Sequence, residues 1–259
     1  VLIGVIQRRK RLAAFKKPKR FDANVVVVGG GSAGLVTSLI VAGAKAKVVL
    51  VEKHRMGGDC LYTGCVPSKS IIRSGRIMSY IRRAADYGIV DAAGKVDFAA
   101  VMQRVQGVIE TIEPHDSPER FTSLGVTCVS GSARLISPYE VEVDGKIITT
   151  ESIVIASGAR PFVPHVPGLA DIDYLTSDNV WSLTELPPRL LVVGGGPIGC
   201  ELAQAFSHLG SKVTQVDMAA RIMPREDEDV SAAVSARFLE HGIDLLTGHK
   251  LLKFETVDG

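Results

Sequence analysis

Two cysteines, Cys60 and Cys65, stand in the segment GGDCLYTGCVPSKSI, close enough for one loop to bring their sulfurs together. A helix is expected to begin at Cys65, because Pro67 then falls in the first turn, where proline is well tolerated. The positive end of the helix dipole at that position favours the thiolate that redox chemistry requires. Lys69 lies about one helical turn further on the same face, so its ammonium can reach what Cys65 faces.

Other readings of the cysteine pair differ in strength. A zinc site normally needs four ligands, and the remaining cysteines, Cys128 and Cys200, lie far away in a predicted strand and a predicted helix. No metal site is therefore predicted. A structural disulfide is disfavoured because no secretion signal is present. Two buried thiols without a redox role remain the open alternative from the spacing alone.

A second pattern that could carry chemistry occurs twice. Residues 24–52 (NVVVVGGGSAGLVTSLIVAGAKAKVVLVE) and 189–217 (RLLVVGGGPIGCELAQAFSHLGSKVTQVD) each read as strand, glycine turn, helix and strand. In both copies the turn has G-x-G-x-x-G spacing, formed by Gly29, Gly31 and Gly34, and by Gly194, Gly196 and Gly199. Such glycines permit a tight turn and close approach of a pyrophosphate to a helix N-terminus.

An acidic residue ends the second strand of each copy, Glu52 in the first and Asp217 in the second, each 18 residues beyond the last glycine. A carboxylate there can accept hydrogen bonds from ribose hydroxyls, so two dinucleotides are expected. A glycine turn that only packs a helix against a strand is the plainer alternative. Asp217 would repel a 2′-phosphate and favours NADH over NADPH, although Arg221 and Arg225 lie close enough to weaken that preference.

The elements that position these residues predict an α/β fold. Short Val- and Leu-rich strands suit a parallel sheet buried on both faces, so we expect two Rossmann-like, doubly wound, three-layer domains. Helices are predicted at about 66–87, 98–112 and 118–124, followed by several short strands with a hairpin turn at Asp144 and Gly145, and a further strand from Ile153. The predicted divisions are an arm at 1–23, a first domain at 24–166 and an incomplete second domain at 167–259.

Composition bounds the function. Apolar residues make up 46% of the sequence and charged residues 22%, which is typical of soluble globular proteins and disfavours disorder. The net charge is only +2, and lysines and arginines are not clustered into a basic stripe on a folded domain, so nucleic-acid binding is not predicted.

The N-terminal arm is uneven. The apolar run VLIGVI precedes QRRKRLAAFKKPKR, which has eight basic and no acidic residues. Basic residues accumulate at the cytoplasmic edge of membrane helices, and six apolar residues are too few to span a bilayer, so one hypothesis is an upstream membrane segment. A disordered basic arm or a cloning boundary is the alternative.

The sequence resembles the pyridine nucleotide-disulfide oxidoreductases, which include mercuric reductase, dihydrolipoamide dehydrogenase and glutathione reductase. The resemblance runs from about Phe21 to Gly259 and is carried by GGGSAG, GGDCLYTGCVPSK, ADYG, VDF, the ASG turn at 156–158 and GGGPIGCELA. The helix from Cys65 onward and the segment DFAAVMQRV look most like the mercuric reductase and dihydrolipoamide dehydrogenase branch. It implies that residues 24–166 bind FAD and residues 167–259 bind NAD(P)H.

The resemblance also implies the site residues. Those expected near FAD are Gly29, Gly31, Ser32, Ala33, Gly34, Glu52, Lys53, Gly58, Asp59, Cys60, Lys69, Ala133, Ala156, Ser157 and Gly158. Those expected near the nicotinamide nucleotide are Gly194, Gly196, Ile198, Gly199 and Asp217. Cys65 would be the flavin-proximal sulfur, Cys60 would exchange with the substrate, and Lys69 would pair with Glu201 beside the flavin. A surface charge at Lys69 and a helix-end charge at Glu201 are the simpler alternatives.

The implied activity is electron transfer from NAD(P)H through FAD to a Cys60–Cys65 disulfide, and then to a small disulfide or a metal ion. The whole protein would be a cytoplasmic homodimer, whose dimerisation domain and catalytic base would lie beyond Gly259, so this chain alone is expected to be inactive. A membrane-tethered flavin module that delivers electrons to a protein partner is the alternative. Tyr62, between the cysteines, departs from the family pattern and predicts restricted substrate access. Leu39 and Ser68 count against glutathione.

Overall fold

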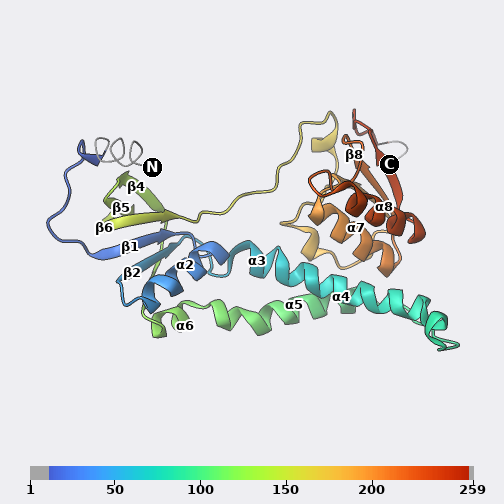
Figure 1. Cartoon of the computed structure of the whole chain (residues 1–259), viewed down its shortest axis with the longest axis horizontal. Coiled ribbons are helices and arrows are strands. Elements are labelled where there is room, and N and C mark those ends of the chain that lie inside the picture. The colour runs from blue at the N-terminus through green and yellow to red at the C-terminus, as the bar shows by residue number, and fades with distance from the viewer. Residues whose placement is uncertain (1–11, 257–259) are drawn as a thin grey trace. The chain divides into compact units, whose positions relative to one another are not determined.

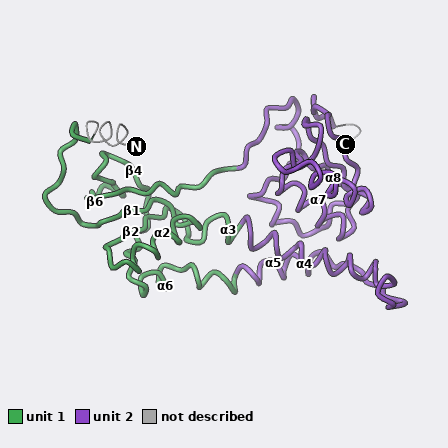
Figure 2. The backbone as a smooth tube through the Cα atoms, in the orientation of Figure 1, with its two compact units in different colours: residues 1–62, 110–160 green, residues 63–109, 161–259 purple. Residues whose placement is uncertain are grey.

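The computed structural model describes residues 12–256, which fall into two compact units. Figure 2 shows them in green and purple. Unit 1 contains the described parts of residues 1–62 and 110–160, and unit 2 those of residues 63–109 and 161–259. The predicted domains differ from these units mainly in the place of residues 63–109, which pack with the second nucleotide-binding pattern.

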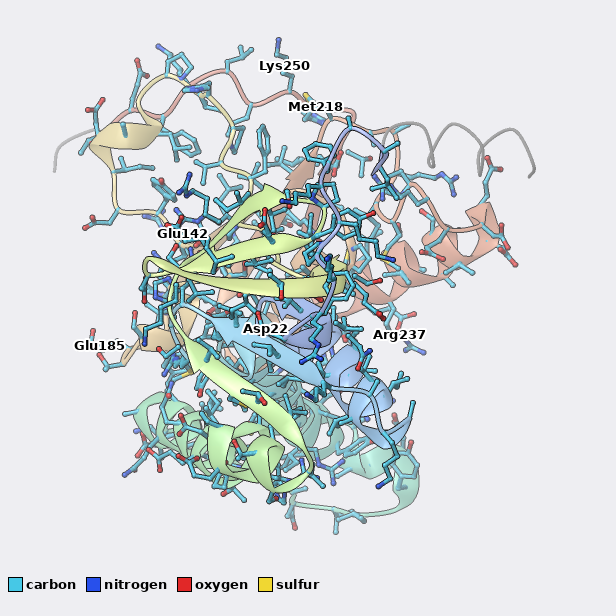
Figure 3. All side chains as sticks on the ribbon, turned by 90° about the vertical axis from the view of Figure 1, so that its left-hand side faces the viewer. Asp22, Glu142, Glu185, Met218, Arg237 and Lys250 are labelled. Carbon is cyan, nitrogen blue, oxygen red and sulfur yellow. The ribbon has the colours of Figure 1, made fainter. Side chains whose placement is uncertain are left out.

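Unit 1 is built on one six-stranded sheet, in the order β3-β2-β1-β6-β5-β4. The strands are β1 (Ala23–Val28), β2 (Val48–Glu52), β3 (Val126–Ser130), β4 (Ala133–Ser137), β5 (Glu140–Val143) and β6 (Lys146–Ile155). Strands β3, β2, β1 and β6 run parallel, while β4, β5 and β6 form an antiparallel meander. Figure 3 draws the side chains of both units and labels two residues of this one, Glu142 on β5 and Asp22 just before β1.

The core of unit 1 lies on both faces of the sheet, as the continuous apolar strands predicted. Side chains alternate along each strand: Val48 and Leu50 of β2 join one buried cluster, while Val49 and Val51 join the other. The first cluster also takes Leu35 from the helix that follows β1, and the second is closed by side chains of β5. The β1 end that carries the first glycine turn is therefore firmly held.

The described part of unit 1 also contains the end of α5 (Phe98–Ile112) and several shorter helical segments. These are α2 (Ser32–Gly43), the one-turn helix α3 (Gly58–Tyr62), η2 (Glu113–Asp116) and α6 (Pro118–Ser123). Helix α6 begins as predicted because the Ser117 hydroxyl accepts a hydrogen bond from the Arg120 amide.

The predicted hairpin is present between β5 and β6, with Asp144 at φ 47° and Gly145 at φ 83°. Both positive values suit a tight two-residue turn. One expectation was wrong: the strand predicted from Ile153 is not separate from the short strand after the hairpin turn. Both belong to β6, which leaves the meander and continues beside β1. No glycine or proline interrupts that stretch, so the backbone has no reason to turn.

Unit 2 has a three-stranded parallel sheet in the order β7-β8-β9, together with the long helix that starts at Cys65. Its elements, labelled in part in Figure 1, are α4 (Cys65–Arg82), η1 (Ala84–Tyr87), α5 (Phe98–Ile112, of which residues up to 109 belong here), η3 (Leu169–Asp171), η4 (Val180–Ser182), β7 (Arg189–Val193), α7 (Pro197–Leu209), β8 (Lys212–Asp217), α8 (Glu228–Glu240) and β9 (Asp244–Thr247). The predicted helix at 66–87 is thus divided into α4 and η1.

Helices α4 and α7 pack closely. Gly75 of α4 makes this possible, because a Cβ there would lie 3.1 Å from the Ala205 carbonyl oxygen of α7. Helix α5 also contacts α7, since the Phe98 and Phe206 ring centroids are 6.0 Å apart. Near the N-terminal ends of α4 and α7, two charged side chains, Lys69 and Glu201, meet across the contact between these two helices.

Candidate functional site

The first glycine turn follows β1 and accepts only glycine at two positions. Gly29 has φ +109°, and a Cβ there would lie 2.2 Å from the Ala156 carbonyl oxygen. A Cβ on Gly34 would lie 1.8 Å from the Gly29 carbonyl oxygen. Helix α2 begins directly after the turn, and its N-cap, Gly31, has no side chain to satisfy the first amides. Those amides and the positive helix end are suited to a phosphate group.

Glu52, at the end of β2, is fixed against this turn. Its Oε2 accepts a hydrogen bond from the Gly30 amide at 2.6 Å, and its Oε1 accepts one from the His54 amide at 2.8 Å. The carboxylate is half-buried, and its orientation is set by backbone donors rather than by a flexible partner.

The other residues predicted near FAD lie at different distances from this turn. Gly58 approaches Gly31 so closely that a Cβ on Gly58 would lie 2.6 Å from the Gly31 Cα. The 156–158 turn reaches the same place, since the Ala156 amide donates to the Val28 carbonyl at 2.8 Å and the Asp59 carboxylate lies 3.8 Å from a Cβ built on Gly158. The predicted residues Ser32, Ala33 and Lys53 are exposed, Ser157 also belongs to the 156–158 turn, and Ala133 packs against the buried cluster beneath the meander.

The second glycine turn repeats the first in unit 2. Gly194 has φ +108°, and a Cβ on Gly199 would lie 2.4 Å from the Gly194 carbonyl oxygen. Asp217 Oδ2 accepts from the Gly195 amide at 2.5 Å, and its Oδ1 accepts from the Ala219 amide at 2.7 Å. Within residues 12–256, nothing lies within 4 Å of a Cβ built on Gly194 or Gly196. Ile198, at the start of α7, is 65% exposed.

A buried polar pair supports this second turn. The Gln215 side chain, 1% exposed, donates from Nε2 to the Gly194 carbonyl oxygen at 2.9 Å. The Cys200 thiol donates to the Gly195 carbonyl oxygen at 3.5 Å and accepts from the same Gln215 amide at 3.7 Å. Burial raises the pKa of the Cys200 thiol, which keeps it protonated as a donor.

The two cysteines of the central segment belong to different elements. Cys60 is partly exposed in the middle of α3, and Cys65 is exposed as the first residue of α4. The helix therefore starts where Pro67 predicted, with the Ser68 amide donating to the Gly64 carbonyl at 3.0 Å. Both cysteines are present as thiols.

Lys69 and Glu201 meet across the α4–α7 contact. Lys69 Nζ lies 2.6 Å from Glu201 Oε2, and the two side chains are 59% and 43% exposed. The contact implied by the resemblance is present. An ion pair this exposed adds at most about 1 kcal/mol to stability, so its position beside Cys65 is of more interest than its energy.

A model of the family described as pyridine nucleotide-disulphide oxidoreductase matches residues 23–259. The chain belongs to this family. It is 32% identical over 244 residues to a mercuric reductase from Bacillus cereus, covering 94% of this chain and 39% of that protein. It is also 32% identical over 240 residues to a dihydrolipoyl dehydrogenase from Acholeplasma laidlawii, covering 90% of this chain and 71% of that protein.

Among solved structures, the chain is similar to the HOCl-induced flavoprotein disulfide reductase RclA from Escherichia coli. The TM-score is 0.75 at 27% identity, over 89% of this chain and 50% of that one. The chain spans about half the length of most of the curated relatives that it matches.

Members of this family use FAD and NAD(P)H, and the residues present fit both nucleotides. The turn at Gly29 offers uncapped helix amides and a fixed carboxylate, Glu52, as a ribose and pyrophosphate site requires. The turn at Gly194 offers the same arrangement with Asp217, and the space above its glycines is open among the described residues. Two turns of this kind fit one dinucleotide each.

Other expectations concern metals and membranes. Across residues 12–256, no three or more histidine, cysteine, aspartate or glutamate side chains are grouped so as to hold a metal ion. Nor does the described part of the chain contain a helix with the length and apolar character needed to cross a membrane. Residues 1–11, which include the apolar run behind the membrane hypothesis, lie outside the described residues.

Two features of the site were not predicted from the sequence. One is the Gln215–Cys200 pair. The other surrounds Tyr62, which was expected to restrict substrate access but is only 9% exposed, with its hydroxyl turned to Glu113. Its departure from the family pattern was the one signal available, and that signal carried no information about the partner, because Glu113 is 51 residues away in sequence.

Proposed function

We propose that the whole protein is an FAD-dependent oxidoreductase that passes electrons from NADH to a Cys60–Cys65 disulfide and then to a small disulfide substrate. The observation that carries this proposal is the repeated turn: each unit has a glycine turn and a backbone-fixed carboxylate, an arrangement suited to a dinucleotide. The family to which the chain belongs supports the coupling of both sites to one redox-active cysteine pair. The whole protein is further proposed to act as a homodimer in the cytoplasm.

When bound, NADH and FAD would supply the two electrons that reduce the disulfide. The chain would hold FAD at the Gly29 turn, with Glu52 accepting from the ribose, and NADH at the Gly194 turn, with Asp217 in the same role. Lys69 would be held beside the flavin by Glu201, and the cation there would stabilise negative charge near Cys65.

The cysteines would carry out the exchange in two steps that balance. The Cys60 thiolate attacks one sulfur of the substrate disulfide, so a mixed disulfide forms and the first substrate thiol leaves with a proton from solvent. The Cys65 thiolate then attacks the Cys60 sulfur, which releases the second substrate thiol and restores the Cys60–Cys65 disulfide. The start of a helix at Cys65 favours its thiolate form in the second step.

The geometry around Asp217 supports NADH as the reductant. The carboxylate is fixed by two amides and would meet a 2′-phosphate with like charge. Arg221, which could have offset that repulsion, donates instead to the Glu226 and Pro224 carbonyl oxygens of its own loop. Its guanidinium is thereby engaged.

A metal ion is a second candidate for the final electron acceptor. It is favoured by the names of the relatives, since several proteins that are 32% to 33% identical to this chain are mercuric reductases. Two thiols so close in sequence also suit a soft ion such as Hg²⁺. Parallel turnover assays with lipoamide disulfide and with Hg²⁺ distinguish the two acceptors.

The proposal is tested by trapping thiols in the FAD-loaded, air-oxidised protein. After anaerobic reduction with NADH, iodoacetamide should label both cysteines in the tryptic peptide from Met56 to Lys69, and neither should be labelled before reduction. Cys60→Ser and Cys65→Ser should each retain FAD and lose reduction of the disulfide substrate. Labelling that is the same before and after NADH, in a protein that dithiothreitol does reduce, would overturn the proposal.

A further inference from the structure

Helix α3, which carries Cys60, is too short to be stable alone. It spans Gly58–Tyr62, a single turn, and isolated helices of this length do not form in water. Its position therefore depends on contacts with the rest of the unit, including those of the two side chains that it buries, Leu61 at 1% and Tyr62 at 9% exposure. Cys60 is partly exposed on the remaining surface. The contacts that hold α3 thus decide where the Cys60 sulfur lies.

The beginning of α3 is fixed by close backbone packing. A Cβ on Gly58 would lie 2.6 Å from the Gly31 Cα, and the Gly57 amide donates to the Gly30 carbonyl at 2.9 Å. The start of the helix therefore lies against the first glycine turn. The other end of α3 carries Tyr62, which is held by side-chain contacts.

The end of α3 is held by a set of contacts that we name the Tyr62 latch, made of Arg55, Tyr62 and Glu113. The Tyr62 hydroxyl donates to Glu113 Oε1 at 2.7 Å, and the Arg55 guanidinium lies over the Tyr62 ring, 3.4 Å from its centroid. A hydrogen bond to a carboxylate and a cation over an aromatic face are both stronger than neutral contacts. The latch joins α3 to the loop after β2 and to η2.

The donor of this latch remains intact at working pH. Burial, reinforced by the hydrogen bond to Glu113, raises the pKa of Tyr62 to about 12. The hydroxyl is therefore protonated throughout the neutral range, and the hydrogen bond does not depend on small changes of pH. All three residues belong to unit 1, as does Cys60.

We propose that Tyr62 is a positioning residue that fixes the substrate-exchanging thiol, Cys60, through the Tyr62 latch. The inference rests on the proposed function, because it concerns the disulfide that Cys60 forms with Cys65. A disulfide between nearby cysteines forms in proportion to the effective concentration of one thiol at the other. A loosened α3 lowers that concentration, so the latch favours the disulfide over the dithiol and limits attack on Cys60 by other reagents.

Tyr62→Phe tests the inference, because it keeps the ring under Arg55 and removes only the hydroxyl. In glutathione buffers we expect the equilibrium to shift about tenfold towards the dithiol, which is about 30 mV for a two-electron couple. Iodoacetamide should alkylate Cys60 of the reduced variant several-fold faster, while the rate at Cys65 stays unchanged. Tandem mass spectra of the peptide from Met56 to Lys69 resolve the two sites.

Two further variants keep the test decisive. Glu113→Gln retains an acceptor for the hydroxyl and should lie between wild type and Tyr62→Phe, and the double variant should be no worse than Tyr62→Phe alone. Tyr139→Phe removes a phenol hydroxyl from the meander of the same unit and should match wild type. If Tyr62→Phe folds, binds FAD and shows wild-type equilibrium and alkylation rates, the inference is wrong. If wild type forms no NADH-reducible disulfide, the proposed function fails instead.

Discussion

The two glycine turns have the same backbone conformation and differ in the residues that surround them. Gly29 and Gly194 have φ of +109° and +108°. In each copy the acid that ends the next strand accepts a hydrogen bond from the amide that follows this glycine, that of Gly30 or of Gly195. In unit 1 the Ala156 carbonyl at the end of β6 closes over the turn. In unit 2, β7 forms the edge of the sheet as described, and nothing among the described residues takes that place.

The layer beneath the turns differs as well. The residue that follows the last glycine of the turn is Leu35 in unit 1 and Cys200 in unit 2, and the residue two positions before the acid is Leu50 in unit 1 and Gln215 in unit 2. The two leucines belong to an apolar core. Cys200 and Gln215 instead donate hydrogen bonds to carbonyl oxygens of the turn. The same local motif thus packs against the end of a neighbouring strand in unit 1, whereas in unit 2 it is held by hydrogen bonds from two buried polar side chains.

The largest effect is expected from alanine at the first glycine of each turn. Gly29→Ala places a methyl group against the Ala156 carbonyl and also strains the backbone at a positive φ, so it should lower the free energy of unfolding of unit 1 by about 4 kcal/mol. Gly194→Ala only strains the backbone and should lower the free energy of unfolding of unit 2 by about 2 kcal/mol. Denaturant curves followed by FAD release for unit 1, and by fluorescence of the single tryptophan, Trp181, for unit 2, measure the two costs. Equal costs would show that the surroundings do not matter.

Exchanging the apolar and the polar residue at the equivalent buried positions, Leu50 and Gln215, should destabilise unit 1 more than unit 2. Leu50→Gln puts an amide into an apolar core and should cost about 3 kcal/mol. Gln215→Leu loses one hydrogen bond to the Gly194 carbonyl but also removes Gln215 Oε1, a buried atom without a partner among the described residues, so the cost should be about 1 kcal/mol. The same two probes report these values, and a larger cost for Gln215→Leu than for Leu50→Gln would contradict the comparison.

Acid should weaken unit 2 through a histidine that unit 1 lacks. Burial, the neighbouring His241 ring, and Arg82 and Arg83 lower the pKa of His208 to about 4, whereas Gly43 occupies its place in the first copy. The neutral His208 ring contributes fully to the stability of unit 2 above the unfolded pKa of 6.5, and this contribution is lost as the pH falls from there to about 4. The loss is at most about 3 kcal/mol.

Denaturation of wild type and His208→Leu at several pH values, followed by Trp181 fluorescence, measures this loss. The variant should show a smaller slope below pH 6.5 than wild type, and part of the slope should remain because burial also lowers the pKa of His241. A wild-type slope no steeper than that of the variant would remove His208 from the account.

A smaller effect is expected at the acids themselves. Asp217→Asn removes the charge that opposes a 2′-phosphate and should raise the ratio of NADPH to NADH affinity roughly threefold to tenfold, at most about 1.4 kcal/mol. Glu52→Gln in the first copy should leave that ratio unchanged and weaken FAD binding. Nucleotide titrations of both variants check this, and an unchanged ratio in Asp217→Asn would place the determinant elsewhere.

Local features of this molecule were predictable from its sequence. Each strand-turn-helix pattern follows from short-range glycine spacing and apolar runs, and the start of α4 at Cys65 follows from Pro67. The turn at Asp144 and Gly145 likewise depends only on residues that favour positive φ.

Contacts between distant segments were not predictable from periodicity. Lys69 and Glu201 are 132 residues apart, and only the family resemblance indicated their pairing. Residues 63–109 pack with the second pattern because of side-chain fit between α4 and α7, such as that at Gly75, which no local pattern encodes. The partner of Tyr62 and the role of Gln215 are hidden for the same reason, since each depends on which buried group the fold brings alongside.

The central claim is that one disulfide, Cys60–Cys65, receives the electrons that the flavin takes from NADH. It is tested most directly by anaerobic titration of the oxidised, FAD-loaded protein with dithionite. The account predicts uptake of about four electrons per FAD in wild type, two for the flavin and two for the disulfide, and about two in Cys60→Ser. Uptake of about two electrons by both proteins would contradict it.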